Sequence, residues 1–269
     1  MTDTALIAGA GVLPARLAAA MPARPLVAAL EGFEPSGITP DLQFRVERLI
    51  PFLDHLCDQG ITRVCFAGAV RRPRLDPSLF DAQTARIVPR LLAAMQRGDD
   101  ATLREVLALF EEAGLTIVGV EDLAPALVPG AGVICGTPGP RDEADATRAA
   151  AIVAALGSVD VGQGCVVQQG LCLGVEAIPG TDAMLRGVAQ IPLTLRPDAG
   201  QGRGLFYKAP KPGQDRRVDL PALGPETVDR AADAGLGGMV WQAGGVIVLD
   251  LPVMTARATA QGLFLWARA

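Results

Sequence analysis

The first half of the chain alternates short apolar runs with longer segments in which apolar residues recur at helical spacing. Runs of four or five apolar residues are typical of strands buried on both faces, and i, i+3, i+4 spacing is typical of amphipathic helices. This alternation predicts a parallel sheet with helices on its faces, a Rossmann-like α/β fold. Strands are predicted at 5–8, 26–30, 64–67 and 116–120, and helices at 13–21, 42–59, 85–95 and 101–113.

The second half has a different order of elements. Helices alternate less regularly with strands, and two pairs of apolar runs flank glycine-containing turns, which is typical of hairpins. We therefore predict an α+β fold with a mixed sheet. The predicted hairpins are 164–177, turning near Gln169-Gly170, and 240–249, turning at Gly244-Gly245; the other strands are 204–208 and 264–266, and the helices are 144–156, 181–189, 225–234 and 253–261.

Proline and glycine are concentrated between these halves, in the segment from Val128 to Glu143. Such punctuation marks a boundary between domains. A length of 269 residues also favours two domains. We predict an N-terminal Rossmann-like domain at 1–128, a linker at 129–143 and a C-terminal α+β domain at 144–269.

Composition and charge exclude several function classes. The net charge is −5 with scattered basic residues, so no nucleic-acid partner is expected. We find neither a run of about 18–20 apolar residues nor a secretory signal, and cysteines without a CxxC spacing indicate free thiols, so we expect a cytoplasmic protein. His55 is the only histidine, which excludes a His-rich zinc or di-metal site, and neither a Gly-x-Ser-x-Gly elbow nor a Walker A loop occurs.

A glycine loop follows the first predicted strand. Gly9-Ala-Gly11 resembles the start of a dinucleotide-binding fingerprint, and Glu31 lies where a ribose-binding acid is expected. However, Pro14 replaces the third glycine of that fingerprint. Three interpretations stay open: a nicotinamide or flavin site, a generic phosphate or ribose contact at a helix N-terminus, and a structural turn.

Two further segments place polar residues at predicted helix starts. Asp99 and Asp100 lie between two helices, where they either cap the second helix or bind magnesium or substrate. Gly180-Thr181-Asp182 opens a helix after a strand that ends in Glu176. We expect Thr181 to be the N-cap, and the same helix N-terminus offers backbone N–H groups to an anion.

The densest cluster of charge lies in a proline-rich segment. Of 24 basic residues only Lys208 and Lys211 are lysine, and Arg216, Arg217 and Asp219 follow within a few residues. Hydrolysis of a pyrophosphate needs cations on the non-bridging oxygens and a carboxylate that holds Mg²⁺ or orients water. The segment therefore either binds a pyrophosphate or forms a solvated loop.

These motifs together resemble a known family, the two-domain UDP-2,3-diacylglucosamine pyrophosphatases of bacterial lipid A synthesis. This type is unrelated to the metallophosphoesterase that serves the same step in other bacteria. The motifs occur in the family's order and span nearly the whole chain. They are Gly9-Ala-Gly-Val-Leu-Pro14, Phe66-Ala-Gly-Ala-Val-Arg-Arg-Pro73, Gly98-Asp-Asp100, Asp160-Val-Gly-Gln163, Val175-Glu-Ala177, Gly180-Thr-Asp-Ala-Met-Leu-Arg186, Lys208-Ala-Pro-Lys211 and Val218-Asp-Leu-Pro221.

The resemblance implies Mg²⁺-dependent attack of water on the α-phosphorus, giving UMP and 2,3-diacylglucosamine 1-phosphate. It also implies a substrate site between the domains, a homodimer, and an essential aspartate at Asp219. The chain departs from the family at Ala10, at Gln168-Gln169 and at Gln242, where a glycine, an acid and a glutamate are usual. We predict catalytic roles for Lys208, Lys211 and Asp219, metal binding by Asp99 and Asp219, and substrate contacts at Gly9, Gly11, Gly68, Asp99, Asp100, Glu176, Gly180, Thr181, Asp182 and Arg217.

Two other function classes remain as alternatives: a nicotinamide oxidoreductase that uses the first glycine loop, and a non-catalytic nucleotide-sugar binding module. The implied substrate carries two acyl chains, so we also expect an apolar surface at the loop 75–80 or the helix 87–95. With a net charge of −5, contact with the inner membrane surface is expected to be transient.

Overall fold

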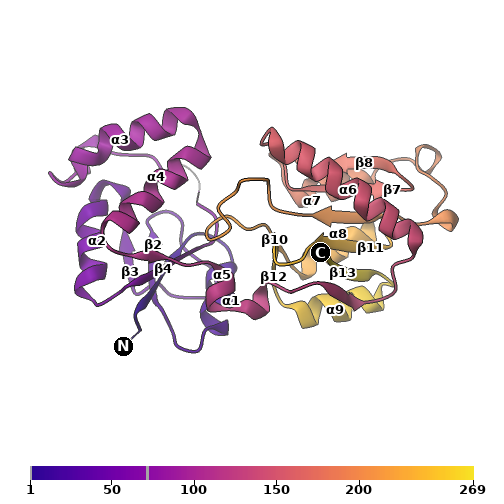
Figure 1. Ribbon diagram of the computed structural model, residues 1–269, viewed down its shortest axis with the longest axis horizontal. Coiled ribbons are helices and arrows are strands. Elements are labelled where there is room, and N and C mark those ends of the chain that lie inside the picture. The colour runs from indigo at the N-terminus through magenta and orange to yellow at the C-terminus, as the bar shows by residue number, and fades with distance from the viewer. Residues whose placement is uncertain (1, 71–72) are drawn as a thin grey trace. The chain divides into compact units, whose positions relative to one another are not determined.

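The computed structural model describes residues 2–70 and 73–269, except for the side chains of Asp99 and Asp100. The chain forms two compact units, an N-terminal unit that ends at Ala124 and a C-terminal unit that begins at Pro125 (Figure 1). Within the described residues, no helix is long and apolar enough to cross a membrane.

The N-terminal unit is built on a five-stranded sheet in the order β3-β2-β1-β4-β5, and every pairing in it is parallel. This is the strand order of a Rossmann-like half, so the predicted fold is confirmed. The central strands are buried and mostly apolar because helices cover both faces. The strands are β1 (Thr4–Ala8), β2 (Leu26–Leu30), β3 (Leu42–Phe44), β4 (Arg63–Ala67) and β5 (Thr116–Ile117).

The helices of the N-terminal unit form two groups. The short helices α1 and α5 contact each other, while α3 contacts both α2 and α4. An aromatic cluster beneath α2 and α4 joins Phe52, Phe66 and Phe110 at ring distances of 5.1 and 6.3 Å. The helices are α1 (Leu13–Ala20), α2 (Leu49–Asp58), α3 (Thr84–Arg97), α4 (Asp99–Glu112) and α5 (Val120–Leu123), with 3₁₀ turns at Val46–Arg48 and Pro77–Leu79.

Two predicted elements of this unit are wrong in part. The segment 42–59, predicted as one helix, begins with strand β3 and becomes helical only at Leu49 after a 3₁₀ turn. Pairing with β2 decides the first three residues, which are too few to show a period of two in the sequence. The predicted strand 116–120 is only two residues long, and Val120 already begins α5.

The C-terminal unit contains a six-stranded sheet in the order β6-β13-β11-β9-β7-β8. Its centre, β13-β11-β9, is parallel, whereas β6, β7 and β8 are antiparallel to their neighbours, so the predicted mixed sheet is confirmed. The strands are β6 (Gly132–Cys135), β7 (Gly164–Gln168), β8 (Leu171–Val175), β9 (Leu205–Lys208), β11 (Gly238–Gln242) and β13 (Phe264–Arg268); β10 (Ala222–Leu223) and β12 (Ile247–Val248) form a separate parallel pair.

Helices cover both faces of this sheet and divide the core into two clusters. One cluster lies under α6 and includes Val153 and Tyr207. The other lies under α7, α8 and α9 and includes Phe206 and Trp241. The helices are α6 (Pro140–Ser158), α7 (Thr181–Ala189), α8 (Pro225–Asp233) and α9 (Leu251–Ala260), with 3₁₀ turns at Pro125–Leu127, Leu193–Leu195 and Ala199–Gln201.

One of the two predicted hairpins exists. β7 and β8 pair around a turn at Gln169 and Gly170, which have φ angles of 50° and 78°, and the buried Asp145 carboxylate accepts both backbone N–H groups of this turn at 2.8 and 2.7 Å. The predicted hairpin at 240–249 is wrong. β11 has β9 and β13 on its two sides, so β12 has no free edge there and pairs with β10 instead.

The segment 129–143, predicted as a linker, is structured. It contains β6, which pairs with β13 at the edge of the sheet, and the first turn of α6, which begins at Pro140. Its prolines and glycines mark the ends of these elements rather than a free connection. Gly136, with a φ of 70°, lies where an added Cβ atom would be 2.7 Å from Phe264.

Candidate active site

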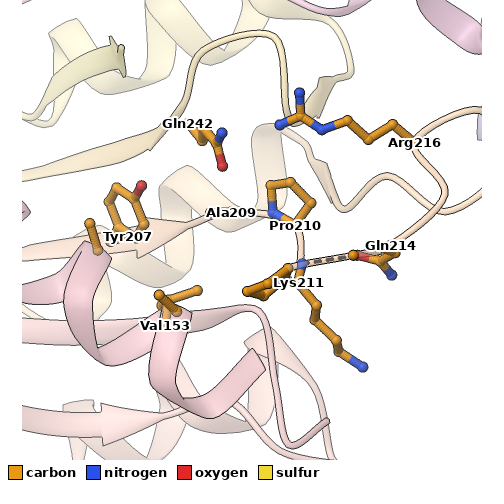
Figure 2. Close-up of a pocket in the computed structure, with 12 residues that line it drawn as sticks. Val153, Tyr207, Ala209, Pro210, Lys211, Gln214, Arg216 and Gln242 are labelled. Atoms are coloured by element: carbon orange, nitrogen blue, oxygen red, sulfur yellow. Dashed lines mark hydrogen bonds between the residues drawn. The ribbon is translucent and has the colours of Figure 1, made fainter. Parts of the chain in front are cut away.

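The two lysines lie in different surroundings because β9 ends between them. Successive side chains of a strand point to opposite faces. Tyr207 packs under α6, so Lys208 lies on the other face, with α7. Lys211 is the third residue after the strand and lines the pocket under α6 (Figure 2). The sequence motif Lys208-Ala-Pro-Lys211 therefore does not form one cationic patch.

Lys208 is buried in a compact polar cluster. Its ammonium donates to both oxygens of Glu176, at 3.2 and 3.0 Å, and to the Thr181 hydroxyl at 2.5 Å. Side-chain exposures of 6% for Lys208 and 12% for Glu176 make this a buried ion pair. Gly164 makes room for the carboxylate, since a Cβ atom there would lie 2.7 Å from Glu176 Oε2. The cluster is thus fully partnered within the unit.

The start of α7 completes this cluster. Gly180, with a φ of 83°, occupies the N-cap position, and Thr181 is the first helical residue, so the predicted N-cap was wrong by one residue. The Thr181 hydroxyl bonds to Glu176 and Lys208 instead of capping the helix. Asp182 is exposed in the first turn, where a carboxylate is favourable near the positive end of the helix.

A second polar cluster surrounds Lys211, and Gln214 is its centre. Gln214 Oε1 accepts from the Lys211 backbone N–H at 3.0 Å and from Gln163 Nε2 at 2.9 Å, and its Nε2 donates to the Asp219 carboxylate. The Lys211 ammonium pairs with Asp160 at 2.5 Å. Asp219 itself is exposed. The loop thus holds an accessible carboxylate in one orientation through a glutamine.

The segment 160–163 connects the two clusters. Gly162 touches the backbone of Glu176 so closely that a Cβ atom would lie 2.0 Å from its carbonyl oxygen, and the Gln163 carbonyl accepts from the Ala209 N–H at 3.0 Å. Asp160 has a φ of 59°, a strained conformation for a residue other than glycine. The motif thus has an ion-pair partner of Lys211 at Asp160, a close backbone contact at Gly162 and a hydrogen bond to Gln214 at Gln163.

The remaining arginines of the loop differ in their contacts. Arg217 forms a two-pronged pair with Asp215, with Nε to Oδ1 at 3.0 Å and a terminal nitrogen to Oδ2 at 2.7 Å. Arg216 instead lines a pocket of about 490 Å³ together with Tyr207 and Gln242 (Figure 2). This pocket lies wholly within the C-terminal unit.

In the N-terminal unit the predicted glycines meet at the ends of β1 and β4. Gly9 and Gly68 are pressed together: a Cβ atom on Gly68 would lie 2.5 Å from the Gly9 carbonyl oxygen, and one on Gly9 would lie 2.7 Å from the Ala69 carbonyl oxygen. Ala10 and Ala69 exchange two backbone hydrogen bonds of 2.9 Å. Gly11, with a φ of 99°, faces open space. Ligands of open α/β sheets bind at this type of position, where the strand order reverses.

Comparison with known proteins agrees with this architecture. Residues 3–127 match the LpxI N-terminal domain, and residues 130–266 match the LpxI C-terminal domain. The chain belongs to the LpxI family. It is 39% identical over 270 residues, 98% of this chain and 96% of the relative, to the UDP-2,3-diacylglucosamine pyrophosphatase LpxI of Caulobacter vibrioides. The family resemblance of the sequence is confirmed.

The described part of this LpxI-family chain offers few ligands for a metal ion. Among the described side chains no group of three or more histidine, cysteine, aspartate or glutamate residues could hold a metal ion. Asp219 offers a single exposed carboxylate. Such a site fits Mg²⁺, which is commonly bound through one or two carboxylates, water and substrate phosphates. The side chains of Asp99 and Asp100, predicted as ligands, lie outside the described part of the structure.

Two residues of the cluster around Lys211, Gln163 and Gln214, were not predicted from the sequence. Neutral amides carry no charge signal, and Gln214 was hidden among charged and proline neighbours. Gln163 is the last residue of the motif Asp160-Val-Gly-Gln163, so its place in that motif was the signal that could have identified it. Only the fold shows that both amides meet above the end of β9.

Proposed function

We propose that this chain hydrolyses the pyrophosphate of UDP-2,3-diacylglucosamine to UMP and 2,3-diacylglucosamine 1-phosphate, in lipid A biosynthesis. The observation that carries this proposal is the match to LpxI across both units, including 39% identity to a relative named for that activity. The loop 208–219 adds chemical support, because it combines cations with an exposed carboxylate.

In this proposal Asp219 orients the attacking water or holds Mg²⁺. Its carboxylate is exposed to solvent and is held by Gln214, so it is positioned before substrate binds. Lys211 and Arg216 line the same pocket as Gln214, the residue that holds Asp219, and supply positive charge for phosphate oxygens that gain negative charge in the transition state. Mg²⁺ on Asp219 and the substrate phosphates would neutralise further charge on the phosphate oxygens.

Lys208 has a different proposed role. Its ammonium is buried and already has three hydrogen-bond acceptors within the unit. It therefore acts as a positioning residue that holds Glu176 and the first turn of α7. The free backbone N–H groups of that turn are suited to an anion.

We further propose a homodimer in the cytoplasm that contacts the inner membrane surface transiently and takes its substrate between the two units. Apolar side chains of the N-terminal unit support the lipid contact, since Leu79 and Leu92 are 39% and 47% exposed. They belong to the loop and the helix that the sequence predicts as the acyl-binding surface.

The decisive experiment is hydrolysis of UDP-2,3-diacylglucosamine in H₂¹⁸O, followed by ³¹P NMR. Attack on the α-phosphorus places ¹⁸O in UMP, and attack on the β-phosphorus places it in the sugar phosphate. We expect the label in UMP only, and no turnover when EDTA removes divalent metal. A label in the sugar phosphate contradicts the proposed attack, and a lack of any turnover with Mg²⁺ contradicts the proposed activity.

A further inference from the structure

The pocket under α6 contains three polar groups without a partner. Tyr207 is only 6% exposed, yet its hydroxyl has no hydrogen-bond partner among the described residues, and neither has the Gln242 carboxamide or the Arg216 guanidinium. All three line the same pocket (Figure 2). Gln242 is half-buried and Arg216 is exposed, and none of the three groups contributes a fully buried atom, so all three are accessible to a ligand in the pocket.

Two walls of the pocket are apolar and suit the face of a ring. One wall is the α6 surface of Ala150, Val153 and Ala154, and another is Pro210. These side chains are short or rigid, so they present a smooth surface to a ring. Burial raises the pKa of Tyr207 above its ordinary value, so the hydroxyl remains a neutral donor at physiological pH.

We propose that this pocket binds the uracil base of a uridine nucleotide, with Gln242 and Tyr207 bonding the imide edge and Arg216 meeting the adjacent phosphate. The identity of the nucleotide rests on the proposed function. An imide presents one N–H between two carbonyl oxygens. A carboxamide accepts from that N–H and donates to one carbonyl, and a tyrosine hydroxyl donates to the other.

The other parts of the proposed substrate fit this pocket less well. An acyl chain needs an apolar lining throughout, whereas amide and guanidinium groups line this pocket. A pyrophosphate needs several cations, but the Lys211 ammonium pairs with Asp160 and points away from Tyr207 and Gln242 (Figure 2). Arg216 is then the lining cation that is left for the ligand, since the Lys211 ammonium is paired with Asp160, and one such cation matches a base with a single neighbouring phosphate.

The test is binding of UMP and of ribose 5-phosphate to the full chain, measured by calorimetry with and without Mg²⁺. Tyr207→Phe and Gln242→Met each remove only hydrogen-bonding groups, and each should weaken UMP about tenfold, as expected for one lost bond to a neutral partner. Ribose 5-phosphate, which lacks the base, should bind these two variants as it binds the wild type. Arg216→Met should weaken both ligands.

Matched controls are Gln190→Met and Arg186→Met, which change exposed residues of the same unit outside the pocket. We expect UMP to bind both controls like the wild type, and all variants to unfold at wild-type denaturant concentrations. As a direct localisation, irradiated 5-iodo-UMP should attach to peptides containing residues 150–154 or 207–216.

Three results would overturn the pocket assignment: equal UMP affinity in Tyr207→Phe, Gln242→Met and the wild type, cross-linking elsewhere, or no UMP binding at millimolar concentration. None of these readouts uses turnover. A wild-type protein that hydrolyses UDP-2,3-diacylglucosamine but fails these tests retains the proposed function and loses only the uracil site. A protein that binds UMP as described but does not hydrolyse UDP-2,3-diacylglucosamine retains the uracil site and loses the proposed function.

Discussion

At the scale of single residues, the chain uses its two lysines for opposite purposes. Lys208 is buried and bonds to Glu176 and Thr181, whereas the Lys211 ammonium reaches Asp160, whose side chain is 82% exposed. A guanidinium is wider than an ammonium and bonds in a fixed plane, so arginine is a poor substitute in the enclosed position. The strand end between the two lysines separates these environments.

We predict that Lys208→Met destabilises the C-terminal unit by about 3 kcal/mol, because it leaves the Glu176 carboxylate buried without a counter-charge. Both tryptophans, Trp241 and Trp266, lie in this unit, so fluorescence in a urea titration reports on it alone. The double variant Lys208→Met/Glu176→Leu should recover most of the loss. Equal losses in the single and double variants would contradict a penalty for the unpaired Glu176 carboxylate.

A second prediction concerns the exposed carboxylate. Asp219→Asn should lower kcat about a hundredfold or more while substrate affinity changes little, since a group that orients water or holds metal acts mainly in the transition state. Single-turnover assays with UDP-2,3-diacylglucosamine, together with equilibrium binding, separate the two effects. Asp233→Asn, which changes an exposed carboxylate of the unit outside the candidate site, serves as the comparison. Wild-type kcat in Asp219→Asn would remove Asp219 from the mechanism.

At the scale of elements, the ends of β1 and β4 are joined by a contact that only glycine permits. Gly9→Ala and Gly68→Ala should each cost about 1–3 kcal/mol, because the added methyl groups would lie 2.7 Å or less from backbone oxygens. Gly11→Ala is the matched control, since it adds a methyl group into open space and strains only the backbone. Thermal unfolding by circular dichroism should rank Gly11→Ala as the mildest; a larger loss there would contradict the packing argument.

The helix pair α3 and α4 is joined by an ion pair that makes its stability depend on pH. Hydrogen bonds from Arg90 hold the pKa of Glu112 below its ordinary value of 4.5, against a smaller opposing effect of burial. The stabilisation is therefore complete above about pH 4.5 and is lost as pH falls through the lowered pKa. Amide hydrogen exchange of α4 should accelerate in Glu112→Gln at pH 7 but match the wild type near pH 2. An equal difference at both pH values would contradict this.

At the scale of the whole molecule, the two units have separate sheets and internal cores, so each contains what an independent domain needs. The candidate residues are divided between them: Gly11 and Asp99 belong to the first unit, and Lys211 and Asp219 to the second. We therefore predict that chains of residues 1–124 and 125–269 each fold but do not turn over substrate alone.

Cooperative unfolding of each separate chain, followed by circular dichroism, tests the first part of this prediction, and release of UMP tests the second. The UMP-binding experiment applied to 125–269 adds a sharper distinction, because the uracil pocket lies wholly within that unit. We expect this half to bind UMP with nearly full affinity. Full turnover by either half would contradict the division of the active site.

The sequence by itself determined the family, the two-domain order and the fold class of each unit. Hydrophobic periodicity is a local property, so it located nearly all helices and the buried strands, and the Gln169-Gly170 turn was visible because φ angles of 50° and 78° favour such residues. Only the tertiary structure decided the rest. Strand pairing made 42–44 a strand and excluded the hairpin at 240–249, because those choices depend on which edges are free. The end of β9 likewise separated the surroundings of Lys208 from those of Lys211. The fold also brought Gln163 into hydrogen-bonding contact with Gln214, 51 residues further along the chain, which local sequence patterns cannot reveal.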